Sequence, residues 1–227
     1  MRIRAAFALI FILCSFTACR KKARVTQTPP VPQPAVAQQP RVGSTETGVA
    51  SWYGPPYHGR RAADGEIYDM EKMTAAHRTL PFNTWVHVRN LTNEKSCEVR
   101  ITDRGPFVDG RVIDLSKAAA RSIDMLGPGT ATVELTIMAA PQDLPAQQLF
   151  AVQVGAFRDR ERAGHVRDEM ESQYGKARVV ERYSATPFWR VLVGEETSQQ
   201  AAADLAERIM ATGSPAFVVR LDLPGQE

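Results

Sequence analysis

The residues best suited to acid–base chemistry lie in a short turn that follows an apolar-alternating segment, Cys97–Ile101. Asp103 is followed directly by Arg104, Gly105 and Pro106. Gly105 can adopt backbone angles that other residues avoid, and Pro106 disfavours helix in the residue before it. We therefore expect Asp103 to be fixed at the end of a strand, at the edge of a sheet. Such a carboxylate suits an acid catalyst; the alternative is a turn-forming Asp bonded to its own backbone.

Two other ionisable residues, Glu66 and His77, stand out in the same half of the chain. By spacing alone they are a weak signal, because scattered charged side chains are usually solvated. A metal site would have to recruit His58, His77 and His87, but the sequence has none of the common zinc spacings such as HExxH. It also lacks the Gly-x-Ser-x-Gly motif of a serine nucleophile. We expect neither a metal nor another cofactor.

Composition narrows the class of protein. The chain has 227 residues, 44% of them hydrophobic, and a net charge of +3, of which Arg2 and Arg4 contribute two. Nothing in this balance indicates a nucleic-acid partner. The three cysteines, Cys14, Cys19 and Cys97, fit neither metal-ligand spacing nor a disulfide framework. Cys97 lies in a strand pattern, so we expect a buried and inert thiol.

The N-terminus is typical of an exported protein. Residues 1–18 combine a basic start with an apolar run, Ala5–Leu13, that is too short to span a bilayer, so they are predicted to be a signal peptide. Phe16–Cys19 resembles a bacterial lipoprotein cleavage box, with Phe at its first position where Leu is usual. This resemblance implies that Cys19 is lipidated; ordinary cleavage nearby is the alternative. Arg20 stands where an inner-membrane retention signal has Asp, which by resemblance implies the outer membrane.

Two linkers divide the rest of the chain. Residues 19–47 hold five prolines and no apolar period, so they are predicted to form a semi-extended tether behind the lipidated N-terminus. Residues 141–148 form a second, shorter linker. The predicted globular units are therefore residues 48–140 and 149–223.

The first unit is predicted to be a small, mostly β barrel, because short strand-like runs recur between Gly, Pro and Asn turns. The predicted strands are 48–53, 84–88, 97–101, 111–114 and 131–137. Thr74–His77 and Lys117–Leu126 are predicted to be short helical insertions, the second capped by Ser116 or Asp114.

The second unit is predicted to be an α+β sandwich. Its pattern is strand, helix, strand, strand, helix, strand, over 150–157, 160–174, 177–183, 188–193, 198–210 and 216–221. Both helices would cover one face of the sheet, which leaves the other face free to bind a ligand.

The first unit closely resembles the rare lipoprotein A family over all of residues 48–140. The matching motifs are Ala50–Gly54, His58–Arg60, Gly65–Glu66, Ala75–His77, Leu80–Pro81 and Asp103–Phe107. The resemblance implies a six-stranded double-psi β-barrel, related to expansins, and lytic transglycosylase activity on cell-wall glycan. It also implies that Asp103 is the main acid/base, with His77 and Glu66 as its helpers. This chain departs from the family pattern at Ala62, Asp64 and Thr102, where Thr, Asn and Asn are usual.

The chemistry of a lytic transglycosylase suits a single carboxyl group. The sugar's own primary hydroxyl attacks its anomeric carbon, so one residue can protonate the leaving oxygen and then accept the hydroxyl proton. Asp103 would then need to be partly protonated, through burial or a nearby carboxylate such as Glu66.

Several further side chains are predicted to contact the glycan. Trp52, Tyr53 and Tyr57 are expected to line the groove and stack on sugar faces, with Arg104 beside Asp103. For Trp52, a place in the barrel core is an equal alternative.

The second unit resembles the SPOR domain, a module that binds glycan strands stripped of their stem peptides and gathers at division septa. Val152–Phe157 and Trp189–Gly194 carry the match. Strand alternation places Gln153 on the face opposite Val152 and Val154, so we predict that Gln153 and Arg190 contact sugar. For Arg190, the alternative is an ordinary solvent-exposed strand residue.

Three functions remain open from the sequence. The first is an outer-membrane lytic transglycosylase that acts on peptide-free septal peptidoglycan, together with division proteins as partners. The second is a non-catalytic, expansin-like protein that binds peptidoglycan. The third is a plain structural lipoprotein, which two glycan-type domains on one tether disfavour. Intact Asp103, His77 and Glu66 favour the enzyme.

Overall fold

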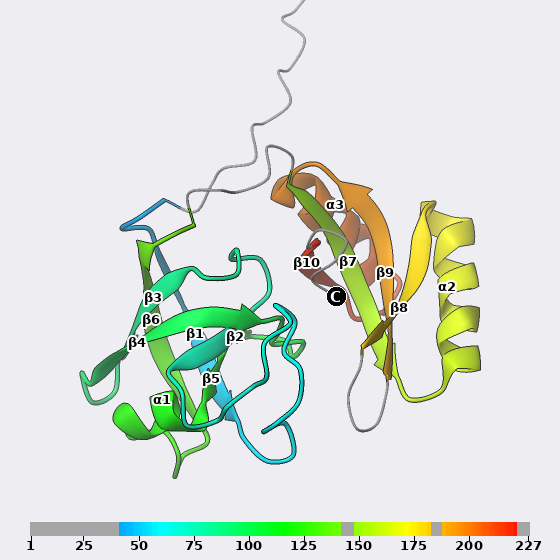
Figure 1. Ribbon diagram of the computed structural model, residues 1–227. Helices are drawn as coiled ribbons and strands as arrows, with labels where there is room; N and C mark the ends of the chain where they lie inside the picture. The colour runs from blue at the N-terminus through cyan, green and yellow to red at the C-terminus, as the bar shows by residue number, and fades with distance from the viewer. Residues whose placement is uncertain (1–40, 142–147, 183–187, 222–227) are drawn as a thin grey trace, which may run out of the picture. The chain divides into compact units, whose positions relative to one another are not determined.

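The computed structural model describes residues 41–141, 148–182 and 188–221 (Figure 1). The predicted signal peptide, Cys19 and most of the tether lie outside these ranges. Among the described residues, no helix has the length and apolar character needed to cross a membrane.

The first domain is a closed six-stranded barrel, as the resemblance implies. Its strands lie in the order β1-β5-β2-β4-β3-β6 around the barrel. Two of the pairings, β1 with β5 and β2 with β4, are parallel, and the others are antiparallel. The elements are β1 Thr45–Tyr53, β2 Thr74–His77, β3 Trp85–Asn90, β4 Ser96–Asp103, β5 Arg111–Ser116, α1 Lys117–Ser122 and β6 Thr130–Ala139.

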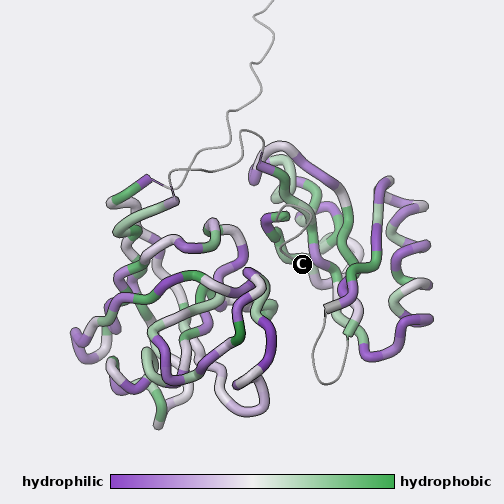
Figure 2. Tube along the Cα trace, in the orientation of Figure 1, coloured by the Kyte–Doolittle hydropathy of each residue, from purple (hydrophilic) through white to green (hydrophobic). Residues whose placement is uncertain are grey.

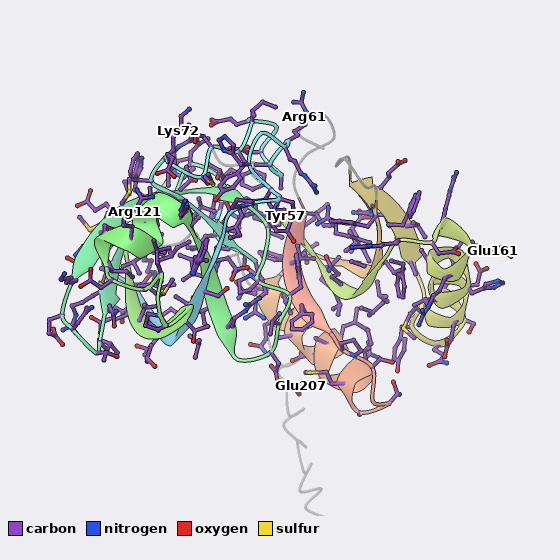
Figure 3. The ribbon with its side chains drawn as sticks, turned by 90° about the horizontal axis from the view of Figure 1, so that it is seen from below. Tyr57, Arg61, Lys72, Arg121, Glu161 and Glu207 are labelled. Carbon is purple, nitrogen blue, oxygen red and sulfur yellow. The ribbon has the colours of Figure 1, made fainter. Side chains whose placement is uncertain are left out.

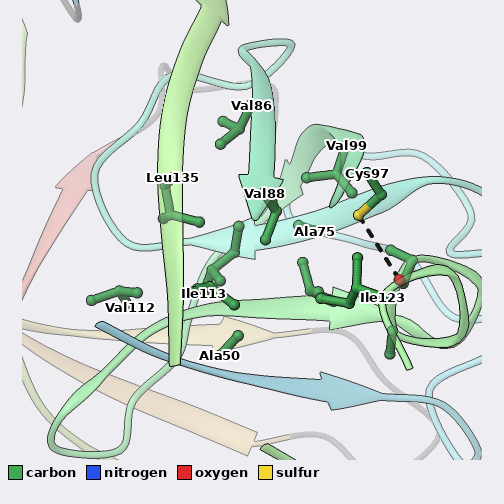
Figure 4. Packing of buried hydrophobic residues seen from close by; sticks show 14 of the residues in the cluster. Ala50, Ala75, Val86, Val88, Cys97, Val99, Val112, Ile113, Ile123 and Leu135 are labelled. Atoms are coloured by element: carbon green, nitrogen blue, oxygen red, sulfur yellow. Dashed lines mark hydrogen bonds between the residues drawn. The ribbon is translucent and has the colours of Figure 1, made fainter. Parts of the chain in front are cut away.

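The barrel interior is filled by the apolar residues that alternate along each strand. Val86, Val88, Val99 and Ile113 are fully buried, and β-branched side chains of this kind pack well on a pleated sheet (Figure 4). The thiol of Cys97 points toward the backbone oxygen of Ala119 in α1, inside this core (Figure 4). Burial raises the pKa of this thiol. The prediction of a buried Cys97 is therefore confirmed.

The structure corrects one predicted element of the barrel. Thr74–His77 is strand β2 and not a helical insertion: all four residues are buried, and Ala75 and Ala76 pair with both β4 and β5. Alanine has the highest helix propensity, but the two alanines adopt a strand here because tertiary pairing outweighs local preference. Helix α1 forms as predicted but ends at Ser122, and the hydroxyl of Ser116 accepts a hydrogen bond from the Ala119 N–H at 3.2 Å as its cap.

The second domain has the predicted order of strands and helices. Its elements are β7 Leu149–Phe157, α2 Arg160–Tyr174, β8 Ala177–Arg182, β9 Phe188–Glu196, α3 Gln199–Met210 and β10 Phe217–Leu221. The sheet order is β10-β7-β9-β8, and all its pairings are antiparallel. Both helices pack on the face that carries Val152, Val154, Val191 and Val193. In Figure 2 much of the trace of α2 has the colour of hydrophilic residues, whereas the central strands of the sheet are largely hydrophobic.

Candidate active site

Asp103 is the last residue of β4, where the sequence places it. Its Oδ1 accepts hydrogen bonds from the N–H of Ala63 at 3.1 Å and from the N–H of Arg104 at 2.7 Å. The chain then turns at Gly105, which has a φ of 146°, a backbone angle that strongly favours glycine. The predicted stiff turn after the strand is therefore confirmed, and it fixes the direction of the carboxylate.

A β-bulge decides which way Asp103 faces. Ala75 of β2 pairs with Ile101 of β4, but the next residue, Ala76, pairs with Asp103, so Thr102 is the extra residue. A bulge of this kind re-aims the side chain that follows it. Without it, Ala76 would lie opposite Thr102 and Asp103 would be shifted along the strand.

The sequence analysis missed a second carboxylate, that of Asp114 on β5. Asp114 pairs with Ala76 from the side opposite Asp103. The hydroxyl of Ser51 donates a hydrogen bond to Asp114 Oδ1, and the Arg111 Nε lies 3.9 Å from the same oxygen. Burial raises the pKa of Asp114, and the charge of Asp103 acts in the same direction. The sequence predicts Asp114 only as a possible helix cap, and its one local signal is its position between apolar Ile113 and Leu115.

These two carboxylates line a hollow on the barrel together with aromatic side chains. The residues of the first domain that line it include Asp103, Asp114, Trp52, Tyr53 and Tyr57. The predicted groove residues thus lie around Asp103. Trp52 also packs in part against the barrel core, and its predicted contact with sugar stays a prediction.

The aromatic wall is pre-organised by contacts among its own rings. Tyr53 stacks on Tyr68 with ring centroids 4.3 Å apart and meets Tyr57 edge-on at 6.1 Å. The hydroxyl of Tyr68 donates to the backbone oxygen of Tyr53 at 2.7 Å. Tyr57 stays 46% exposed, and Figure 3 shows it with Arg61 on the segment that joins β1 to β2. Rings fixed in this way can receive a sugar face with little loss of side-chain entropy.

His77 ends β2 and is buried, with both ring nitrogens occupied. Its Nδ1 accepts from the N–H groups of Thr79 at 3.2 Å and Leu80 at 3.0 Å, and its Nε2 lies 3.2 Å from Glu46 Oε2. The proton of the neutral ring is therefore on Nε2, and the hydrogen bond from His77 holds the pKa of Glu46 below its ordinary value. A sugar hydroxyl would have to displace Glu46 to reach this nitrogen.

Arg104 joins the end of β2 to the Asp103 turn. Its Nη1 donates to the backbone oxygens of His77 at 3.2 Å and Leu80 at 2.9 Å. Its guanidinium lies 3.8 Å from the ring centroid of Phe82, a cation–π contact. Arg104 lines the hollow as predicted, and these contacts also give it a role in holding Asp103 in place.

Glu66 is exposed and paired with Arg100. The two side chains form a bidentate ion pair at 2.9 and 2.7 Å, and the hydrogen bond from Arg100 holds the pKa of Glu66 below its ordinary value. Asp64, two residues before Glu66, interacts electrostatically with Asp103, as Asp114 does, and burial raises the pKa of Asp64. Neither Glu66 nor His77 is among the described residues that line the hollow. Their predicted helper roles remain predictions.

The described part of the chain contains no cluster of three His, Cys, Asp or Glu side chains able to hold a metal ion.

In the second domain, Gln153 of β7 and Arg190 of β9 lie on the helix-free face of the sheet. This follows from alternation, because their neighbours Val152, Val154 and Val191 pack under the helices. A small apolar cluster of Ala151, Leu192 and Val219 lies on the same helix-free face. Both predicted sugar-binding residues thus lie on this face of the sheet, and their role stays a prediction.

Comparison with known proteins agrees with this arrangement. The family model described as lytic transglycolase matches residues 45–135, and the one described as SPOR domain matches residues 146–220. The chain is 36% identical over 203 residues to the endolytic peptidoglycan transglycosylase RlpA of Campylobacter jejuni, and the match covers 79% of this chain and 73% of that protein. The chain belongs to the RlpA family.

Two further members of the RlpA family show similar matches. The Vibrio cholerae protein of the same name is 38% identical over 178 residues, covering 75% of this chain and 67% of that protein. The Helicobacter pylori protein is 36% identical over 195 residues, covering 74% of this chain and 62% of that protein. Membership confirms the double-psi barrel followed by a SPOR domain, and it places this chain in a family of peptidoglycan lytic transglycosylases.

Proposed function

We propose that this protein cleaves the bond between N-acetylmuramic acid and N-acetylglucosamine in peptidoglycan and leaves 1,6-anhydro-muramic ends. The single observation that carries this proposal is the Asp103 carboxylate, fixed by two backbone N–H groups at the edge of a hollow with an aromatic wall. The names of its relatives support the reaction class.

The cleavage needs proton transfer at two oxygens and no water. The glycosidic oxygen must gain a proton as it leaves, and the C6 hydroxyl of the muramic sugar must lose one as it attacks C1. Asp103 is the residue proposed to carry proton transfer in this step, and general acid–base groups contribute factors of about 100 to 10,000 to the rate. Tyr53 and Tyr57 hold the sugar rings on either side of the scissile bond.

The proposed substrate is glycan stripped of its stem peptides, at the division septum. The support is the SPOR domain, whose helix-free face carries Gln153 and Arg190, and the sequence of residues 1–47, which predicts a lipid anchor at Cys19 and a tether. We propose that the protein is an outer-membrane lipoprotein that faces the periplasm. Replacing Cys19 with Ala should release it from membranes and abolish labelling with palmitate; a Cys19→Ala variant that stays in the membrane fraction would contradict the anchor.

The test is the mass of the products released from sacculi. Amidase-treated sacculi, which lack stem peptides, should give fragments with anhydro-muramic ends, one water lighter than hydrolysed ends. Untreated sacculi should give fewer. Products with hydrolysed ends would make the protein a glycosidase, and the absence of any product would favour the non-catalytic, expansin-like binder.

A further inference from the structure

The strand register brings two carboxylates to one face of the barrel. Ala76 of β2 is the direct partner of Asp103 on one side and of Asp114 on the other. Side chains directly opposite each other on neighbouring strands point to the same face, and strands lie about 4.8 Å apart. The backbones of Asp103 and Asp114 are therefore roughly 10 Å apart, two strand spacings, with only the methyl group of Ala76 between their side chains.

The turn after Asp103 closes the remaining space. A Cβ added to Gly105 would lie 3.6 Å from Asp114 Oδ2 and 3.8 Å from the Ala76 Cβ. Asp114 Oδ2 thus lies against the backbone of the Asp103 turn, and both carboxylates line the same hollow. Inverting and retaining glycosidases likewise place two carboxyl groups across one glycosidic bond, about 5 to 9.5 Å apart.

The two carboxylates have different surroundings. Asp103 Oδ1 accepts from two backbone N–H groups. Asp114 Oδ1 accepts from the Ser51 hydroxyl of β1, with Arg111 of β5 and Asp103 of β4 as the charged groups near it. Its Oδ2 has no hydrogen bond within the described part of the chain, which leaves that oxygen available to a substrate. Burial makes the protonated form of Asp114 easier to retain by raising its pKa.

We propose that Asp114 is a second catalytic residue, the proton donor to the leaving glycosidic oxygen, and that Asp103 is the base. In this step the Asp114 Oδ2–H proton passes to the glycosidic oxygen, the C1–O4 bond breaks, and its electron pair stays on the departing N-acetylglucosamine. The C6 oxygen of the muramic sugar forms a bond to C1, and its proton passes to Asp103. Solvent then returns both carboxyl groups to their starting states. This division of labour rests on the proposed function.

The test compares two substrates whose leaving groups differ in basicity. On peptide-free glycan strands, Asp114→Asn should lower turnover by about 100- to 10,000-fold, because the alkoxide leaving group needs a proton. On a dinitrophenyl β-glycoside of N-acetylmuramic acid, whose leaving group needs none, the same variant should keep turnover within about tenfold of the wild type. Asp103→Asn should be slow on both. Asp109→Asn, which makes the same change at an exposed site in the β4–β5 connection, is the matched control.

A second readout is the pH dependence of the residual activity on glycan. The falling limb of kcat/KM at high pH should vanish in Asp114→Asn and persist in Asp103→Asn. An Asp114→Asn protein that is equally slow on both substrates, that retains this limb, or that cleaves glycan normally would overturn the proposal. If the wild type cleaves glycan but not the aryl glycoside, the pH limb alone decides. If the wild type cleaves neither, the proposed function itself fails.

Discussion

At the scale of single residues, the site depends on how burial is distributed among carboxylates. Asp114 and Asp64 are partly buried and their pKa values are raised, whereas exposed Glu66 is paired with Arg100 and its pKa is lowered. A carboxyl that must donate a proton near neutral pH needs surroundings that raise its pKa, such as those of Asp114 and Asp64. Glu66 cannot serve as that donor while Arg100 holds it.

Asp114 should cost the protein stability at neutral pH. The pKa of Asp114 is raised in the folded state. Its favourable contribution to the free energy of unfolding is therefore complete below the ordinary pKa of an Asp side chain, and it is lost as the pH rises through the pKa of the folded state. Asp114→Asn keeps the acceptor for Ser51 and removes the charge. The variant should therefore melt at a higher temperature than the wild type at pH 7, with the gain disappearing near pH 3.

Thermal unfolding followed by circular dichroism checks this prediction, since each kcal/mol shifts the melting temperature of a domain of 60–100 residues by about 4–8 °C. Asp109→Asn, at an exposed position, should show no such pH-dependent gain. A loss of stability in Asp114→Asn at pH 7 would mean that its contacts with Ser51 and Arg111 outweigh its burial.

The sequence was sufficient to find Asp103, because the Asp-Arg-Gly-Pro turn determines its own geometry. It was not sufficient to find Asp114, since a place between Ile113 and Leu115 marks a strand residue but does not show which strand pairs with it. Only the pairing of β5 with β2 brings it to Asp103. His77 was found as a residue, but its contacts with Glu46 of β1 and with Leu80 of the loop after β2 form only in the folded chain, and no local pattern predicts them.

At the scale of elements, the bulge in β4 and the turn after it orient the catalytic edge. The sequence analysis read Thr74–His77 as helical because a four-residue segment rich in alanine has no period to read. Its strand state comes from β4 and β5, which pair with it on both sides. The other predicted strands of the barrel are confirmed because each alternates over at least four residues.

Gly105→Ala tests this turn. The new Cβ would make ordinary contacts with Asp114 and Ala76, so the cost comes from the backbone, whose φ of 146° disfavours any other residue. We expect a loss of about 1–3 kcal/mol in the free energy of unfolding. Turnover should fall as well, because Asp103 moves with the turn.

Chemical denaturation and turnover on glycan strands give the two readouts. Gly127→Ala is the control, since Gly127 has open space around its Cβ position and an ordinary φ. A Gly105→Ala protein with the stability and activity of the wild type would show that the turn tolerates a relaxed backbone.

At the scale of the whole molecule, each domain has a hydrophobic core of its own, one inside the barrel and one between the second sheet and its helices. The fold of both was predictable because their strands and helices are long and regular. Catalysis and targeting should therefore be separable.

A fragment of residues 41–141 should cleave soluble glycan strands but lose efficiency on sacculi. The second domain raises the local concentration of glycan, often to the millimolar range for short linkers. In the full chain, Gln153→Ala with Arg190→Ala should reproduce the loss on sacculi and spare soluble strands. Added Gly-Ser residues between Pro141 and Gln148 should reduce the efficiency of the full chain on sacculi only slowly, because the entropic cost of loop closure grows with the logarithm of linker length.

Product release from both substrates by these variants is the measurement. If the fragment of residues 41–141 is inactive even on soluble strands, the first domain does not act independently of the second. The second domain would then help to build the active site.

The central claim is that Asp103 carries proton transfer in glycan cleavage, and its most direct test is the turnover of Asp103→Asn on peptide-free strands. The amide keeps the shape of the side chain and an oxygen that can accept from Ala63 and Arg104, but it cannot exchange the proton. With a folded protein confirmed by its melting curve, we predict that release of anhydro-muramic ends falls by about 100- to 10,000-fold, while Asp109→Asn stays at the wild-type rate. Near-normal release by a well-folded Asp103→Asn protein would contradict the account.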